Sequence, residues 1–134
     1  MELNSAGDRV WESAPAEHFT GAVWFGPLAP KPRDDSLNAL GVHFEAGART
    51  DWHTHPDGQV LYVTDGAGFV QKDDGESVRI GPGDVVYAPA GEVHWHGATA
   101  HSHMTHLSLT SHGATEWLPR KVTDDEYGAA AQAD

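Results

Sequence analysis

Residues 47–66, GARTDWHTHPDGQVLYVTDG, decide the fold. Within this stretch His53 and His55 are two residues apart, so both imidazoles face the same side if the segment forms a strand. The Pro-Asp-Gly turn at 56–58 reverses the chain and brings Gln59 beside them on the next strand. The stretch therefore predicts two imidazoles and one amide oxygen close together in space.

A second stretch, residues 83–98, GDVVYAPAGEVHWHGA, adds another imidazole at the start of a strand that follows a Pro-Ala-Gly turn. Three imidazoles and an amide oxygen suit a first-row divalent metal ion. The hypothesis is that one ion is bound by four residues, His53, His55, Gln59 and His94. The alternative is that some of them are ordinary core or surface histidines, because ten histidines in 134 residues produce chance pairs.

Short alternating runs between turn signals occur along most of the chain, and helical periodicity is weak. This pattern is typical of an all-β barrel or sandwich. We expect a single domain with a core at about residues 20–112, an N-terminal arm at 1–19 and a C-terminal tail at 113–134. Within the tail, residues 123–127 are a candidate helix start with an acidic first turn.

Turn signals divide the core into strands. The expected strands are 21–26, 40–45, 51–55, 59–64, 68–72, 77–80, 85–88, 93–98 and 103–109. The Asp65-Gly66 turn predicts a hairpin in which 68–72 pairs back with 59–64. The strand at 21–26 is apolar on both faces, which predicts that a second subunit covers its outer face in a homodimer or larger oligomer.

The composition limits the possible partners. Acidic residues outnumber basic ones 20 to 8, and the net charge of −12 opposes binding to nucleic acid or to anionic membranes. The absence of cysteine excludes disulfides and thiolate metal sites. No apolar run is long enough for a bilayer, and no basic segment followed by an apolar one opens the chain. We therefore expect a cytoplasmic protein whose partners are a small-molecule substrate and other copies of itself.

The two stretches together resemble the two motifs of the cupin superfamily. Gly47, His53-Thr54-His55, Gln59 and Gly66 follow the spacing of the first motif. Gly83, Pro89-Ala90-Gly91 and His94 follow the spacing of the second. The resemblance implies a jelly-roll-like cupin β-barrel with a metal at the four candidate positions.

The chain departs from the usual cupin motifs at two positions. Gln59 stands where the first motif usually has Glu, and Ala98 stands where the second usually ends in Asn. Three imidazoles and an amide leave the +2 charge of an ion uncompensated, which makes a stronger Lewis acid toward an alkoxide or carbonyl oxygen. Alternatively, Gln59 is a structural residue beside a site of three histidines.

A narrower resemblance is to the bacterial cupin-type hydroxynitrile lyases. The segments that carry it are 44–50, 52–56, 81–86, 94–98 and 104–107. It implies a manganese-dependent enzyme that cleaves cyanohydrins such as mandelonitrile to an aldehyde and cyanide, with iron, zinc or nickel as other possible metals. The resemblance also implies that the functional threonine is Thr50 and that the functional histidines beside the metal are His96 and His106.

The residues themselves leave alternatives open. His96 shares a strand face with His94, and His106 shares a strand face with Met104 and Ser108. The alternation of side chains along a strand does not say which face points into the barrel. An inward His106 suits proton transfer near neutral pH, whereas a hydrogen-bonded barrel histidine would have no catalytic task. Two other functions use the same site: an iron-dependent cupin dioxygenase, and a module that binds a metal or small ligand without turnover.

Overall fold

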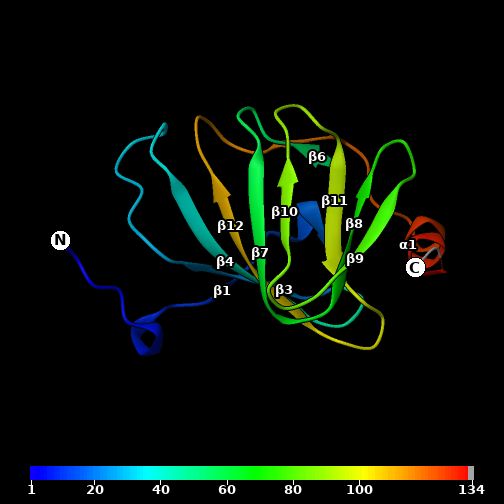
Figure 1. Cartoon of the computed structure of the whole chain (residues 1–134), viewed down its shortest axis with the longest axis horizontal. Coiled ribbons are helices and arrows are strands. Elements are labelled where there is room, and N and C mark those ends of the chain that lie inside the picture. Colours follow the sequence, from blue (N-terminus) through cyan, green and yellow to red (C-terminus); the bar gives the residue numbers. More distant parts are fainter. Residues whose placement is uncertain (133–134) are drawn as a thin grey trace.

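The computed structural model describes residues 1–132 and places two antiparallel β-sheets face to face (Figure 1). The first sheet has the strand order β1-β3-β4-β12-β7-β10. The second has the order β13-β6-β11-β5-β2, and β8 joins it by pairing with β11 and with β9. The strand bounds are β1 Glu12–Ser13, β2 Phe19–Thr20, β3 Val23–Pro27, β4 Asn38–Phe44, β5 Arg49–Thr50, β6 His53–Thr54, β7 Gln59–Gly66, β8 Gly68–Lys72, β9 Ser77–Ile80, β10 Val85–Ala88, β11 His94–Ala98, β12 Met104–Thr110 and β13 Glu116–Trp117. The all-β prediction is confirmed.

The predicted hairpin across Asp65-Gly66 is wrong. Strand β7 pairs with β12 and β10 in the first sheet, whereas β8 pairs with β11 and β9 in the second. The chain crosses from one sheet to the other at this turn instead of folding back on itself. Gly66 has a φ of +77°, and a Cβ there would overlap the carbonyl of His103, so only glycine fits the crossing.

The expected strand at 51–55 is only partly formed, because β6 covers His53–Thr54 alone and Asp51 and Trp52 separate it from β5. The carbonyl oxygen of Asp51 accepts hydrogen bonds from Thr50 Oγ1 at 2.9 Å and from His53 Nδ1 at 2.8 Å. These local side-chain bonds replace ladder bonds with a neighbouring strand and bend the backbone. The bend occurs directly before the first candidate ligand.

Between the sheets lies a core that is apolar toward one end and polar toward the other. The main apolar cluster includes Phe44, Leu61, Val63 and Met104, all at most 1% exposed. Two strands carry polar side chains inward at the polar end. Every residue of β11 is buried, and on β12 the alternating buried residues are Met104, His106 and Ser108. His106 therefore points into the barrel.

Part of the N-terminal segment and the C-terminal segment pack on the barrel. Phe19 of β2 enters the main core, and β1 pairs with β3 at the edge of the first sheet. Helix α1, Asp124–Gln132, begins with a capping box, because Thr123 N donates to Glu126 Oε1 while Glu126 N donates to Thr123 Oγ1. The candidate helix start in the tail therefore forms a helix. The last two residues of the predicted tail lie outside the described residues.

Arg49 connects the C-terminal segment to the second sheet. Its side chain is only 6% exposed, donates from Nε and Nη2 to the carbonyl of Val122, and lies 2.7 Å from the Asp124 carboxylate. Its guanidinium also lies over the ring of Tyr127, 4.6 Å from the centroid. None of the helices within residues 1–132 is long and apolar enough to cross a membrane.

Candidate metal centre

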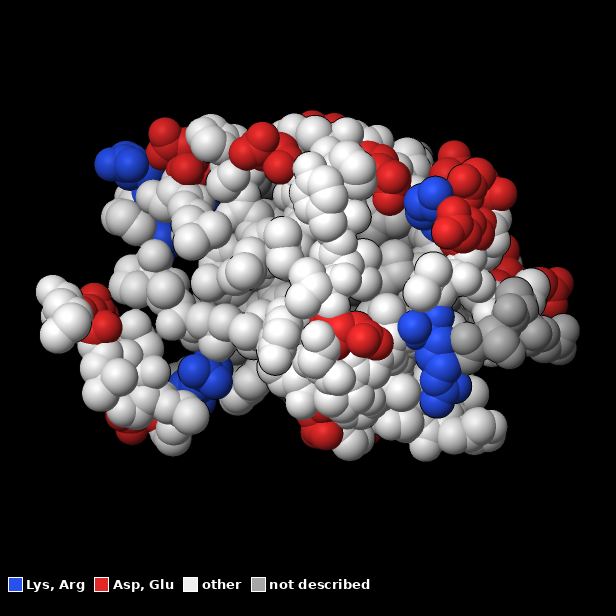
Figure 2. All heavy atoms as spheres, in the orientation of Figure 1, with Lys and Arg blue, Asp and Glu red and all other residues white. Residues whose placement is uncertain are grey.

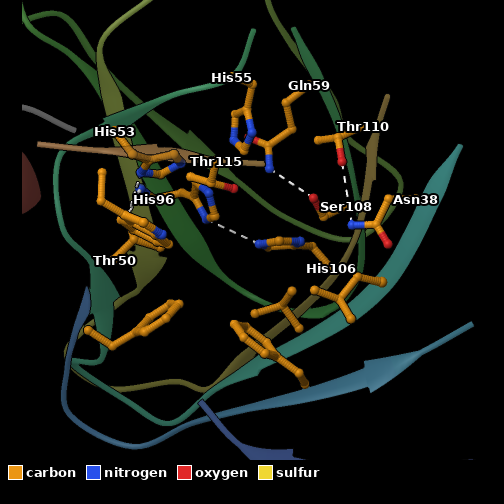
Figure 3. Close-up of a pocket in the computed structure, with 15 residues that line it drawn as sticks. Asn38, Thr50, His53, His55, Gln59, His96, His106, Ser108, Thr110 and Thr115 are labelled. Carbon is orange, nitrogen blue, oxygen red and sulfur yellow. Dashed lines mark hydrogen bonds between the residues drawn. The ribbon is translucent and has the colours of Figure 1, made fainter. Parts of the chain in front are cut away.

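A cavity at the polar end of the barrel collects the candidate residues (Figure 3). It encloses about 430 Å³ of space not occupied by protein atoms, its open mouth included. The lining residues are Phe19, Phe25, Asn38, Leu40, Val42, Thr50, His53, His55, Gln59, His96, His106, Ser108, Thr110, Thr115 and Trp117. None of these lining residues is an aspartate, glutamate, lysine or arginine, although the chain as a whole has a net charge of −12.

His53 and His94 lie opposite each other on the paired strands β6 and β11, with ring centroids 4.4 Å apart. Each ring is oriented by a backbone carbonyl: His53 Nδ1 lies 2.8 Å from Asp51 O, and His94 Nδ1 lies 3.0 Å from Glu92 O. A carbonyl only accepts, so both Nδ1 atoms carry the proton and both Nε2 atoms keep a lone pair. This is the orientation that metal-binding histidines require.

Gln59 presents its amide oxygen to His94. Its Nε2 donates to Ser108 Oγ at 2.8 Å, and its Oε1 lies 3.1 Å from His94 Nε2. In this arrangement an oxygen lone pair and a nitrogen lone pair face each other, which is unfavourable unless a cation lies between or beside them. The contacts of His53, His94 and Gln59 therefore fit a divalent metal ion.

Two histidines could supply the third imidazole, the predicted His55 and also His96. One ring nitrogen from each of His53, His94 and His96 lies within 4.8 Å of the other two, and all three residues are buried. His55 adjoins this trio, with its ring centroid 5.0 Å from that of His53 and 5.7 Å from that of His94. Within residues 1–132, the Nε2 atoms of both His55 and His96 lack a hydrogen-bond partner. Either ring has a free nitrogen for a metal.

His96 also pairs with His106 across the cavity, as Figure 3 shows. His106 Nε2 lies 3.2 Å from His96 Nδ1, and both rings are at least 96% buried. The two neutral rings share one proton between these facing nitrogens. The outer nitrogens are His96 Nε2 and His106 Nδ1, and one of them therefore carries a lone pair while the other carries an N–H. Neither outer nitrogen has a hydrogen-bond partner within the described chain.

Thr50 lies between the two sides of the centre. Its Oγ1 donates to Asp51 O, accepts from His96 N at 3.3 Å, and lies 3.4 Å from His53 Nδ1. The hydroxyl therefore holds the backbone of β5 against β11.

With this geometry in place, comparison with known proteins decides the family. A family model for the cupin domain matches residues 41–110, which include both stretches with the candidate ligands. The chain belongs to the cupin family.

This cupin is 43% identical over 130 residues to an (R)-mandelonitrile lyase from Granulicella tundricola, covering 95% of this chain and 98% of the relative. Among solved structures it is similar to a cupin-like protein from Thermotoga maritima, with 37% identity, a TM-score of 0.86, and coverage of 91% of this chain and 94% of that one. It also superposes on the polyketide cyclase RemF from Streptomyces resistomycificus, with 18% identity, a TM-score of 0.77, and coverage of 95% and 90%. The last likeness shows the fold alone.

Burial lowers the pKa values of the five histidines around the cavity and so favours their neutral forms. Desolvation lowers the pKa of His55 and that of His106 from 6.5 to about 4. Desolvation and the neighbouring imidazoles hold the pKa values of His53 and His96 well below the usual value, and desolvation also lowers the pKa of His94. At pH 7, neutral His53, His55 and His94 each keep a lone pair that can bind a metal, and the His96–His106 pair keeps one outer lone pair that can accept a proton.

The predicted site residues of this cupin lie close together. Thr50, His53, His55, Gln59, His96 and His106 line the cavity, and His94, which is not a lining residue, contacts Gln59. Sequence reasoning did not select the aromatic side of the cavity, where Phe19, Phe25 and Trp117 meet edge to face. It also did not select Ser108, although the shared strand face with His106 was a signal that pointed to it.

Proposed function

We propose that this cupin is a metal-dependent hydroxynitrile lyase that cleaves cyanohydrins of the mandelonitrile type to an aldehyde and hydrogen cyanide, and forms them in reverse. The observation that carries the proposal is the neutral His96–His106 pair, which faces an uncharged cavity beside a cluster of metal-binding side chains. The name of the Granulicella relative, (R)-mandelonitrile lyase, supports the same activity.

The proposed ligands are His53, His55, Gln59 and His94. His55 is preferred to His96 because His96 Nδ1 already contacts His106, whereas His55 Nε2 has no hydrogen-bond partner within residues 1–132. Manganese is the proposed metal, with iron, zinc and nickel as alternatives. A bound divalent ion would supply Lewis-acid polarisation of the substrate oxygen and stabilise negative charge, and the uncharged cavity would leave its charge undiminished.

The proposed proton path runs through the histidine pair. The cyanohydrin O–H proton passes to the free lone pair of the His96–His106 pair while the carbon–oxygen double bond forms. The bond between the carbinol carbon and the nitrile carbon breaks, and its electron pair leaves with cyanide. The protonated pair then returns the proton to cyanide as hydrogen cyanide. Thr50 is proposed to position His96 for this step, because its Oγ1 accepts from His96 N and donates to Asp51 O.

The aromatic side of the cavity is proposed to bind the substrate's organic group. Phe19 lies 5.5 Å from Phe25 and 5.4 Å from Trp117, measured between ring centroids, and Trp117 lies 4.9 Å from His53. If the aryl group of the substrate lies among these rings, the carbinol carbon of the substrate lies near the histidines. Edge-to-face contacts of this kind favour aromatic over small aliphatic substrates.

The test is a mandelonitrile assay on protein stripped with a chelator and reloaded with manganese. The expected result is release of benzaldehyde and cyanide well above the metal-free sample, with preference for one enantiomer. Benzaldehyde release equal to that of the stripped sample would refute the lyase. An oxygen electrode in the same experiment tests the dioxygenase alternative with a diketone substrate.

We also propose that copies of this chain associate through the outer face of the first sheet. Its cross-strand register places Val85, Tyr62 and Leu107 in one row and Tyr87, Val60, Leu109 and Ala39 in the next. None of these seven positions is charged, and Val85, Tyr62 and Tyr87 are 60%, 43% and 68% exposed. Figure 2 shows charged side chains mainly along the margins and little charge over β12 and β7.

A second copy fits this face better than another partner because the chain carries a net charge of −12. Two copies repel each other through most surfaces, whereas the uncharged rows can meet without that cost. The strand at 21–26, from which the sequence predicted an oligomer, is partly covered by the chain itself. The indole of Trp11 lies over Gly26 and Gly41, where a Cβ would overlap it. The proposed association of copies therefore depends on strands β10, β7 and β12.

A further inference from the structure

We infer that Ser108 is a positioning residue that fixes which end of the Gln59 carboxamide faces the histidines. The inference rests on the proposed metal centre and adds a residue to it. A carboxamide has one end that can bind a metal, the oxygen, and one that cannot, the NH₂ group. A glutamine ligand therefore needs a neighbour that fixes the orientation of its carboxamide. A glutamate ligand does not need such a neighbour, because its two oxygens are equivalent.

Ser108 provides the acceptor for the end that cannot bind a metal. Gln59 Nε2 donates to Ser108 Oγ at 2.8 Å, and the two residues are only 4% and 7% exposed. Figure 3 shows the Gln59 amide with its nitrogen toward Ser108. Water has little access at this depth, so loss of the serine hydroxyl would leave a buried N–H group without a partner, which is costly.

The strand register explains why Ser108 has this role. On β12, Thr110 is directly opposite Gln59, and Ser108 is opposite Leu61, the next inward residue of β7. The Thr110 hydroxyl accepts instead from Asn38 Nδ2 at 3.5 Å. Ser108 is therefore the diagonal neighbour that the long Gln59 side chain reaches, and its bond turns Oε1 toward His94, 3.1 Å away.

The consequence is a difference between glutamine and glutamate at position 59. With Gln59, removing the Ser108 hydroxyl leaves an NH₂ group without an acceptor whenever the oxygen faces the metal. With glutamate there is no NH₂ group, so the same removal matters little. A merely structural role for Ser108, such as filling space in the barrel, would have the same effect in both backgrounds.

The experiment is a calorimetric titration of Mn²⁺ into chelator-stripped protein, without substrate, for the natural chain, Ser108→Ala, Gln59→Glu and the double variant. We expect Ser108→Ala to weaken Mn²⁺ binding by about tenfold or more in the Gln59 background, and by less than about threefold in the Gln59→Glu background. Ser102→Ala is the matched control, because Ser102 donates to the adjacent His103 carbonyl outside the cavity.

Equal losses in both backgrounds, or no loss in either, would overturn the role of Ser108. Failure of the natural chain to bind Mn²⁺ would instead overturn the proposed metal centre, and the inference with it. If Ser108→Ala does not fold, as judged by circular dichroism, Ser108→Cys keeps the side-chain volume and replaces the hydroxyl by a weak acceptor. It must then show the same dependence on residue 59.

Discussion

His96 belongs to one sheet and His106 to the other, yet their ring nitrogens lie 3.2 Å apart in the middle of the barrel. The contact joins the sheets through a group that can gain and lose protons. Phe44 packs against both rings, with centroid distances of 5.8 Å to His96 and 5.4 Å to His106. The pair is therefore held in place by apolar packing, while its outer nitrogens stay without protein partners.

Replacing His106 with alanine should abolish lyase activity without removing the metal. If the pair transfers the substrate proton, kcat with mandelonitrile should fall by about a hundredfold or more. Manganese content, measured by inductively coupled plasma mass spectrometry, should stay that of the natural chain. His101→Ala, at an exposed position, is the control. Retained activity in His106→Ala would exclude the proposed proton path.

Replacing His55 and His96 separately should identify the third imidazole ligand. We expect His55→Ala to lose manganese on dialysis and His96→Ala to keep it, because His96 is already engaged by His106. Metal analysis after reloading gives the answer without any substrate. The reverse pattern would assign His96 to the ion, in agreement with the trio of closest ring nitrogens.

The metal-free protein should lose stability as the pH falls from about 6.5 to about 4. The pKa of His106 is lowered from 6.5 to about 4, so within this window the unfolded chain binds a proton that the folded chain does not. The free energy of unfolding must then fall with decreasing pH. His106 alone contributes about 3 kcal/mol to this loss, and the other buried histidines act in the same direction. Thermal unfolding of chelator-treated protein measures the effect, and a Tm that stays level or rises toward pH 4.5 would contradict it.

A charge placed on the outer face of the first sheet should reduce the oligomer mass. Val85→Glu introduces a carboxylate into the uncharged rows, and Val78→Glu makes the same change on β9 of the other sheet, where the valine is similarly exposed at 52%. Light scattering after size exclusion should show a multiple of the 14.4 kDa chain mass for the natural protein and for Val78→Glu, and a smaller species for Val85→Glu. A natural protein that runs as a monomer would refute association through this face.

The sequence predicted the class of fold and most of the cavity because both depend on short-range patterns. His53, His55 and Gln59 flank one turn, so their closeness in space does not depend on how the sheets are arranged. All three line the same cavity. Strand positions followed from alternation and turn residues in the same way.

Strand partners could not be predicted in this manner. A turn such as Asp65-Gly66 shows that the chain changes direction, but whether the flanking strands pair or enter different sheets depends on distant segments, here β12 and β11. Trp117 was missed for a related reason. It lies in a segment that looks like an irregular tail, and it reaches the cavity because β13 pairs with β6 beside His53.

The bonds from Arg49 to Val122 make the C-terminal segment a support for the cavity that holds the candidate ligands, since Arg49 directly precedes Thr50 in β5. A protease cut between residues 118 and 123 should therefore loosen the wall from which Thr50 contacts His96, even though every proposed ligand lies elsewhere in the chain. For the same reason, an affinity tag or fusion partner belongs after helix α1 and not in place of it.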